Sequence, residues 1–218
     1  MPTALVTGGT GRVGGGVAAR LQAEGFAVLA AGRRDGDVSK PDEALTLVER
    51  CVAEHGGLDL LVNAAADGFW PKPVGELTED DWDAAFGAVA KGSFFVTQAA
   101  APYLGRSELG LVVMIEHIAS FQPWPSFAAH CAAKAAQAML TRVLARALAP
   151  KVRVCGVAPG SVAVEHGLEE RRAAETLLGR IGSPDDVAEA VLYLVRARFV
   201  TGSTIFVDGG RMIARGAR

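Results

Sequence analysis

Glycine recurs through residues 7–16 (TGGTGRVGGG), directly after a short apolar run. Glycines there permit a tight turn and let backbone N–H groups approach a phosphate, and a following helix presents its positive end to the same anion. A merely flexible glycine loop is the competing interpretation. Because the cluster lies at the first strand-to-helix turn of the chain, the sequence predicts a pyrophosphate site and, with it, a dinucleotide cofactor.

Two arginines, Arg33 and Arg34, end the second apolar run, where a site for NAD(H) would place a carboxylate. A planar guanidinium meets phosphate oxygens bidentately, so this pair, with Arg12 in the glycine turn, favours the 2′-phosphate of NADP(H). Two alternatives stay open. The arginines could serve only to protect a sheet edge, and Asp35 is compatible with NAD(H).

The elements that would position these residues alternate along the chain. Short apolar runs at 4–7, 27–31, 58–63, 111–115, 152–157 and 204–207 are continuous rather than alternating, as in strands buried on both faces of a parallel sheet. Between them, Thr78 and Ser183 each precede acidic residues, and Pro184 follows Ser183, which predicts two helix starts. The pattern predicts a doubly wound, Rossmann-like α/β fold.

Composition narrows the class of protein. The 218 residues are 50% hydrophobic, which favours a single domain that spans residues 1–218. The formal net charge of −2 favours a small-molecule partner rather than nucleic acid. No apolar run is long enough to span a membrane, and a cytoplasmic protein is expected. The helix expected at 131–149 is apolar or small on nearly every face, which predicts burial all round, partly against another subunit of a homodimer or homotetramer.

Several motifs together resemble the short-chain dehydrogenase/reductase family over essentially the full length. They are TGGTGRVG at 7–14, NAAA at 63–66, His130 and Lys134 as H-x-x-x-K, APG at 158–160 and FVTGSTIFVDGG at 199–210. Arg12, LAPKVRV at 148–154 and DGGR at 208–211 are similar to the pteridine reductase and dihydromonapterin reductase branch. The resemblance implies an NADP(H)-dependent reductase of a pterin-like or other carbonyl or imine substrate.

The resemblance also implies which residues contact cofactor and substrate. For the pyrophosphate they are Thr7, Gly8, Gly9, Arg12, Val13 and Gly14; for the adenine, Asp37 and Val38; for the riboses, Asn63, Ala64 and Lys134; and for the nicotinamide, Pro159, Gly160 and Val162. For the substrate they are Phe69, Trp70 and Arg12, with the pterin stacked on the aromatic ring.

The resemblance breaks down at the active site. Family members carry Asn, Ser, Tyr and Lys, with Asp at the Ser position in the pteridine branch. Alignment on Lys134 places His130 at the tyrosine, His117 at the serine or aspartate and Val89 at the asparagine. Only the lysine is kept, and valine cannot hold a relay water by hydrogen bonds as an amide can.

Three interpretations of the histidines stay open. An imidazole can replace the tyrosine as general acid, although an ammonium at i+4 favours its neutral form, which is the wrong form for an acid. His130 and His117 could instead be remnants in a binding protein without turnover, or packed histidines in a pocket of changed shape. No metal site is expected, because converging ligands are not evident.

A further departure is a gap in the fold. In the family, a helix and a strand separate the arginine-bearing strand end from the Asp-Val pair, but here Arg34 and Asp37 are three positions apart. A crossover needs at least about 10 residues. We therefore expect a sheet that lacks this strand, with 27–31 at its edge and an adenine pocket open on one side.

Aromatic residues follow the carboxyl ends of strands, where α/β sheets bind ligands. Phe69, Trp70, Phe121 and Trp124 are such residues, and both substrate stacking and ordinary core or subunit contacts fit them. The charged segment 165–175 fits either a substrate lid or a solvated helix face.

Overall fold

The structure is a computed structural model that describes residues 1–67, 69–162 and 166–214. Within these ranges, six parallel strands form one sheet in the order β2-β1-β3-β4-β5-β6. The strands are β1 (Thr3–Thr7), β2 (Ala27–Ala31), β3 (Leu60–Asn63), β4 (Leu111–Ile115), β5 (Arg153–Pro159) and β6 (Thr204–Val207). Every residue of β1, β3 and β4 is buried, which confirms the double-sided burial expected from their continuous apolar runs.

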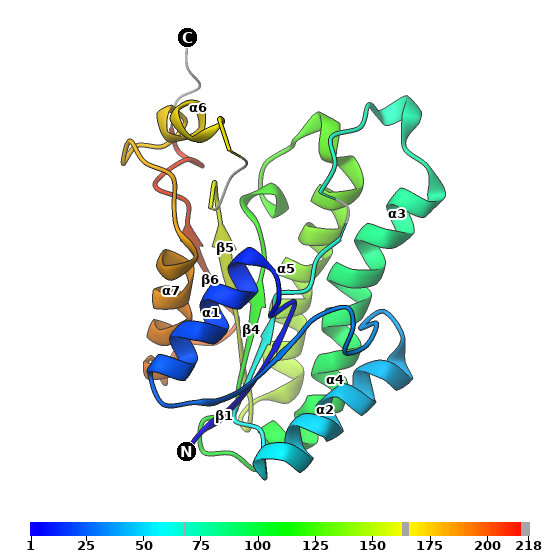
Figure 1. Ribbon diagram of the computed structural model, residues 1–218, viewed down its shortest axis with the longest axis vertical. Coiled ribbons are helices and arrows are strands. Elements are labelled where there is room, and N and C mark those ends of the chain that lie inside the picture. The colour runs from blue at the N-terminus through cyan, green and yellow to red at the C-terminus, as the bar shows by residue number, and fades with distance from the viewer. Residues whose placement is uncertain (68, 163–165, 215–218) are drawn as a thin grey trace.

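Helices cover both faces of the sheet (Figure 1). On one face lie α1 (Arg12–Ala23) and α7 (Pro184–Arg196), and on the other lie α2 (Pro41–His55), α4 (Gly92–Leu104) and α5 (Ala128–Leu148). A π-helical turn, Gly87–Lys91, joins α3 (Glu79–Phe86) to α4, and the short α6 (Glu169–Ala174) precedes α7. The expected doubly wound α/β fold is confirmed.

The helix starts follow their local sequences. Thr78 and Ser183 each accept a hydrogen bond from the backbone N–H three residues on, and the carboxylates of Asp81 and Asp186 each accept one from the backbone N–H of the capping residue. These reciprocal bonds satisfy N–H groups that a helix leaves unpaired. Both predicted starts are confirmed.

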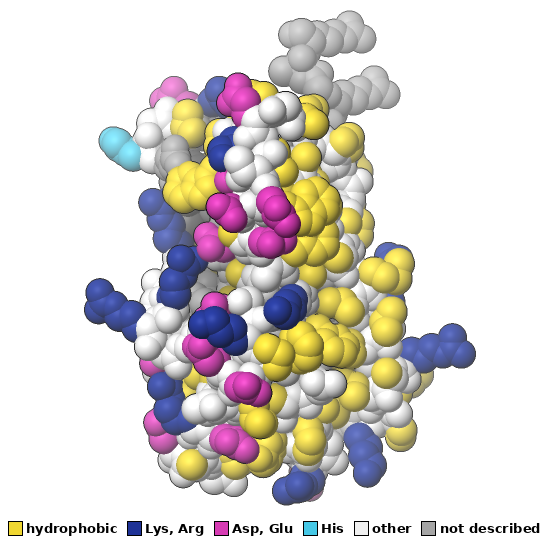
Figure 2. All heavy atoms as spheres, turned by 90° about the vertical axis from the view of Figure 1, so that its right-hand side faces the viewer, with side chains coloured by type: hydrophobic (Ala, Val, Ile, Leu, Met, Phe, Trp, Pro, Cys, Tyr) yellow, Lys and Arg dark blue, Asp and Glu magenta, His cyan; other side chains and the backbone are white. Residues whose placement is uncertain are grey.

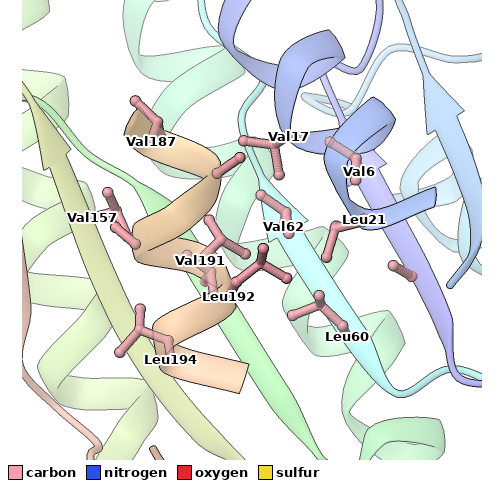
Figure 3. Packing of buried hydrophobic residues seen from close by; sticks show 14 of the residues in the cluster. Val6, Val17, Leu21, Leu60, Val62, Val157, Val187, Val191, Leu192 and Leu194 are labelled. Atoms are coloured by element: carbon pink, nitrogen blue, oxygen red, sulfur yellow. The ribbon is translucent and has the colours of Figure 1, made fainter. Parts of the chain in front are cut away.

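The hydrophobic core has one layer on each side of the sheet. Figure 3 shows Val17 and Leu21 of α1 beside Val187 and Val191 of α7, packed on strand residues such as Val62. All of these side chains are almost fully buried, and each contributes roughly 1.5–3 kcal/mol relative to exposure. The two layers hold the carboxyl ends of the strands in fixed positions.

The predicted gap in the fold is confirmed. Strand β2 is an edge strand that pairs with β1, and no described strand pairs with its outer side. The chain turns from Ala31 directly into α2, which begins at Pro41. The order therefore reverses between β1 and β3, and α/β sheets bind ligands in the crevice at such a point.

Some boundaries and one burial pattern differ from expectation. The run at 58–63 is strand only from Leu60, and the run at 152–157 continues to Pro159. Helix α5 is not buried all round, because Met139 and Val143 are each more than half exposed. Small residues on every face gave no sign of which side faces outward. No described helix is both long enough and apolar enough to cross a membrane.

Candidate active site

The glycine turn at the end of β1 is packed so closely that side chains would not fit. Gly8 has φ +65°, and a Cβ added to it would lie 2.5 Å from the carbonyl oxygen of Ala64. A Cβ on Gly14, in the first turn of α1, would lie 2.3 Å from the carbonyl oxygen of Gly8. The glycines therefore let α1 begin directly against the ends of β1 and β3.

A cleft of about 570 Å³ opens beside this turn, at the carboxyl ends of β1, β2 and β3. Ten residues that the sequence assigned to the cofactor line it: Thr7, Gly8, Arg12, Val13, Gly14, Arg33, Asp37, Val38, Ala64 and Val162. Sequence reasoning missed Ala65, Ala66 and Ala88, which also line it and carry no chemical signal of their own. Glycine and alanine make up much of its lining, which leaves room for a bound ligand.

Thr7 and Asn63 are held by the protein itself. The Thr7 hydroxyl accepts hydrogen bonds from the amides of Ala64 (3.2 Å) and Ala65 (3.3 Å), so it fixes the loop after β3. Asn63 is 1% exposed and donates to Thr97, which directs its amide into the core rather than the cleft. Both residues shape the walls of the cleft from behind.

The two arginines after β2 differ in position. Both side chains are exposed, but Arg33 lines the cleft and pairs with Asp67 at 2.8 Å, whereas Arg34 is not among the residues that line it. Asp35 accepts from the amide of Gly32 (2.8 Å) and pairs with Arg50 (3.0 Å). Because both of its oxygens are engaged in the turn, Asp35 is poorly placed to bind ribose hydroxyls.

Pro159 and Gly160 lie at the end of β5, outside the lining of the cleft, as does Gly9 of the glycine turn. A Cβ on Gly160 would lie 2.8 Å from the Cα atom of Asp208, so this glycine permits close contact with the segment after β6. Val162, two residues on, does line the cleft.

Lys134 of α5 is buried, with 4% of its surface exposed, and does not line the cleft. Its Nζ atom donates to the carbonyl oxygen of Ile115 at 2.6 Å and to Oε1 of Gln137 at 2.9 Å. Burial lowers the pKa of Lys134 to about 8, against an opposing effect of the nearby Glu116. A fraction of Lys134 is therefore neutral at slightly alkaline pH.

His130 lies one turn before Lys134 on α5 and is 5% exposed, with neither ring nitrogen bonded to a described residue. Burial, and secondarily the Lys134 ammonium, lower the pKa of His130 to about 3. The imidazole is therefore neutral at physiological pH. The sequence predicted a neutral His130 from the charge of Lys134, but desolvation is the larger cause of the lowered pKa.

His117 follows β4, and its ring centroid lies 5.4 Å from that of His130. Its Nδ1 atom accepts a hydrogen bond from the amide of Ala119 at 3.1 Å. The neutral ring therefore carries its proton on Nε2. Burial, followed by the effect of His130, lowers the pKa of His117 to about 3.

Aromatic rings surround the two histidines. Phe69 contacts His130 edge-on at 4.8 Å between ring centroids and stacks on Phe127 at 4.6 Å, and Trp124 contacts His117 at 5.0 Å. Phe121 contacts Phe206 instead. Phe127 was missed by sequence reasoning, since an isolated phenylalanine before a helix has no distinguishing signal.

A second cavity of about 140 Å³ is lined in part by His130. Trp70 and Phe127 line it together with Asp67, which continues the loop from the larger cleft. Lys72 and Asp81, ion-paired at 2.5 Å, form part of its wall. His130 therefore stands beside a space that a substrate group could enter.

Arg211 lies four residues after the end of β6 and contacts the aromatic cluster around the two histidines. Its guanidinium lies 4.9 Å from the ring centre of Trp124 and donates to the Ser161 hydroxyl at 2.8 Å. It also pairs with Glu175, just after α6, which connects the charged segment to the aromatic cluster. Of the segment 165–175, Glu165 lies outside the described residues. Arg211 is the last residue of the DGGR motif at 208–211, but its contacts could not be predicted from the sequence.

Removing the Phe69 ring is expected to raise the pKa of His130. Burial is the main cause of the lowered value, and Phe69→Ala admits water to the imidazole, so the pKa should rise from about 3 by at least about one unit toward 6.5. Titration of the His130 ring protons by NMR measures this. Phe206→Ala, which removes an aromatic contact with Phe121 only, should leave His130 unchanged. An unchanged pKa of His130 in Phe69→Ala would show that the Phe69 ring does not shield the imidazole from water.

Comparison with known proteins gives consistent matches along the whole chain. The family model described as enoyl-(acyl carrier protein) reductase matches residues 13–211. A granaticin polyketide synthase protein of Streptomyces violaceoruber, named for ketoacyl reductase activity, is 36% identical over 96% of this chain and 95% of its own length. Human dehydrogenase/reductase SDR family member 4 is 32% identical over 95% of this chain and 86% of its own length.

Solved structures match equally well. A 3-ketoacyl-(acyl-carrier-protein) reductase from Brucella melitensis, solved in complex with NADH, superposes with a TM-score of 0.91 at 26% identity, over 97% of this chain and 98% of that one. An aldohexose dehydrogenase from Thermoplasma acidophilum reaches the same TM-score at 23% identity, which shows the shared fold.

Proposed function

The chain belongs to the short-chain dehydrogenase/reductase family, and on that premise we propose that it reduces the carbonyl group of a small molecule with a nicotinamide dinucleotide, preferably NADP(H). It is an NAD(P)-dependent oxidoreductase of that family. One observation carries the assignment. The cleft at the glycine turn runs along the strand ends to the loop at 66–67, which adjoins the buried His130.

The residues present fit a dinucleotide. Gly8 and Gly14 leave backbone amides unobstructed at the start of α1, where the helix dipole favours a pyrophosphate. Asp37 and Val38 border the end of the cleft next to the edge strand, where the adenine would lie without a covering strand. Val162 borders the opposite end. The cofactor supplies the hydride, and the protein holds and orients it.

His130 is proposed to donate the hydrogen bond that polarises the substrate carbonyl. With its pKa near 3 the ring is neutral, so it acts as an N–H donor rather than as an imidazolium. A neutral imidazole can polarise a carbonyl in this way. His117 carries its proton on Nε2 and supports the same oxygen as a second donor. Lys134, which corresponds to the family's lysine, supplies the positive charge beneath them.

In this assignment the family's active-site set is altered, with histidines at its tyrosine and serine positions and Val89 at its asparagine. Val89 is fully buried and packs with Ala129 and Ala133 of α5. Its position supports a packing role in place of the polar one. Hydrogen bonding to the substrate oxygen therefore rests on the two imidazoles.

The alternative is a protein that binds NADP(H) without turnover, as a sensor or partner subunit. Two neutral histidines favour it, because neither is a strong acid at physiological pH. Loss of nicotinamide absorbance with a carbonyl substrate separates the two functions. Tight dinucleotide binding without any turnover would favour the binding protein.

The cavity beside His130 is lined by Trp70 and Phe127, and Phe69 and Trp124 pack against Phe127, which supports a flat or ring-bearing substrate. A pterin-like substrate stays a prediction from the resemblance, because the ketoacyl reductases and the aldohexose dehydrogenase described above are named for other substrates. Dihydropterins, aromatic aldehydes, quinones and ketoacyl thioesters form the panel to assay.

Arg33 is proposed to select NADP(H). Because a charge-assisted hydrogen bond is worth about 1.5–3 kcal/mol, Arg33→Ala should weaken NADPH binding roughly 10- to 100-fold with little change for NADH. Arg34→Ala is the matched control, since its side chain is exposed outside the cleft. Fluorescence titration gives both affinities. Equal losses for the two dinucleotides in Arg33→Ala would remove the argument for NADP(H).

A homodimer or homotetramer is proposed from the outward-facing helices. Figure 2 shows hydrophobic side chains gathered among charged ones on the face that carries α3 and α4. Trp82 of α3 is 42% exposed and stacks on Phe86, and Met139 and Val143 expose apolar surface on α5. A second copy would cover these side chains.

A further inference from the structure

A carboxylate lies buried beneath the proposed site. Glu116 follows β4 immediately, precedes His117 and is only 2% exposed. The Thr141 hydroxyl of α5 lies 2.6 Å from its Oε1 atom, and the Thr204 hydroxyl of β6 lies 3.0 Å from its Oε2 atom. Burial raises the pKa of Glu116, whereas both hydroxyls and the nearby Lys134 favour the charged form.

The fold makes room for this carboxylate. Gly156 lies inside strand β5, where glycine normally weakens a strand. A Cβ at this position would lie 2.1 Å from Oε1 of Glu116. Gly156 therefore permits the carboxylate to occupy the space beside the sheet.

The same polar layer contains Lys134. Lys134, Gln137 and Thr141 are spaced along one side of α5, and all three are buried. Lys134 donates to Gln137 and to the carbonyl oxygen of Ile115, the residue before Glu116. The Gln137 amide in turn donates to the Ser93 hydroxyl of α4 at 2.7 Å. The ammonium thus lies in a fixed position near the buried acid.

The other ionisable groups around this pair are few in the described chain. His130 and His117 both sense the charge of Lys134 and are neutral, and Arg211 also acts on His117. Arg142 acts on Glu116 from α5. Among the described residues, Glu116 is the one whose charge raises the pKa of Lys134.

We propose that Glu116 is a positioning residue that keeps Lys134 protonated beneath the active site, acting as its buried counter-charge within the Thr141–Gln137 layer. This role concerns the lysine of the proposed reductase and so rests on the proposed function for its consequence, although the charge coupling exists without turnover. Removing the carboxylate should leave the buried Lys134 ammonium with only the neutral acceptors of Ile115 and Gln137 and no negative charge nearby. Its neutral form should then prevail at lower pH.

Glu116→Gln tests this by NMR of the lysine side-chain resonances, with Lys134→Arg for assignment. The pKa of Lys134 should fall from about 8 by at least about one unit, a tenfold change in its protonation equilibrium. Glu49→Gln, which changes an exposed carboxylate on α2, should leave it unmoved. An unchanged pKa in Glu116→Gln overturns the proposal.

A second variant covers the case in which Glu116→Gln does not fold. Thr141→Val keeps the carboxylate but removes one hydroxyl bond, so the pKa of Glu116 should rise and that of Lys134 fall by a smaller amount. In an active enzyme, the loss of kcat with rising pH should begin at a lower pH in either variant, with KM little changed. If the NMR shift occurs without turnover in the unsubstituted protein, the proposed function fails while the coupling holds. An unchanged pKa of Lys134 in Thr141→Val overturns the proposed charge coupling between Glu116 and Lys134.

Discussion

Alanine in place of Gly14 is expected to weaken dinucleotide binding by roughly 10- to 100-fold, because overpacking of this kind costs about 1–3 kcal/mol. The added methyl group would lie 2.3 Å from the carbonyl oxygen of Gly8, and neither backbone segment can yield without opening the turn. The start of α1 would then move away from the place where its amides meet the pyrophosphate. Isothermal titration with NADPH measures the loss.

Gly57→Ala is the matched control for this experiment. A Cβ there has no atom within 4 Å, and the residue needs no left-handed backbone, so binding should not change. Thermal unfolding of both variants separates lost binding from lost folding. A folded Gly14→Ala variant that binds NADPH as well as the unsubstituted protein would show that the cofactor lies elsewhere.

His130→Phe is expected to lower kcat by about 10²- to 10³-fold, the usual cost of removing one hydrogen-bond donor to a developing oxyanion. Phenylalanine retains the packing against Phe69 but removes both ring nitrogens. The Kd for NADPH should stay within about twofold, because His130 does not line the cofactor cleft. Steady-state kinetics on the best substrate of the panel, with Kd from fluorescence, gives both quantities.

His130→Tyr gives this prediction a sharper outcome. If the natural chain is catalytic, the phenol replaces one donor by another, and His130→Phe remains the less active variant. If the natural chain is inactive and His130→Tyr gains turnover, the histidine is a remnant and the chain is a dinucleotide-binding protein. Undiminished kcat in His130→Phe would likewise exclude His130 from the chemistry.

Local rules account for what could be predicted from the sequence. The capping pattern at Thr78 and Ser183 defines helix starts through bonds within four residues, and the short spacing from Arg34 to Asp37 excludes a crossover by length alone. The glycine turn was predicted for the same reason. Its glycines are required by backbone contacts between neighbouring segments.

Side-chain direction could not be predicted in this way. Asn63 points into the core and Thr7 bonds the β3 loop, because each has partners that come from distant parts of the chain. Arg33 lines the cleft and Arg34 does not, because only one side of the turn after β2 faces the cleft. Glu116 and Gly156 are also 40 positions apart, so their fit is evident only once β4 and β5 lie side by side.

Calorimetric titration of the unsubstituted protein with NADPH, and separately with NADH, tests the central claim most directly. We predict one saturable binding event per chain, tighter for NADPH, with a matching rise in Tm. Heat and Tm that are unchanged with both dinucleotides would contradict a nicotinamide cofactor in the glycine-turn cleft, and with it the reductase.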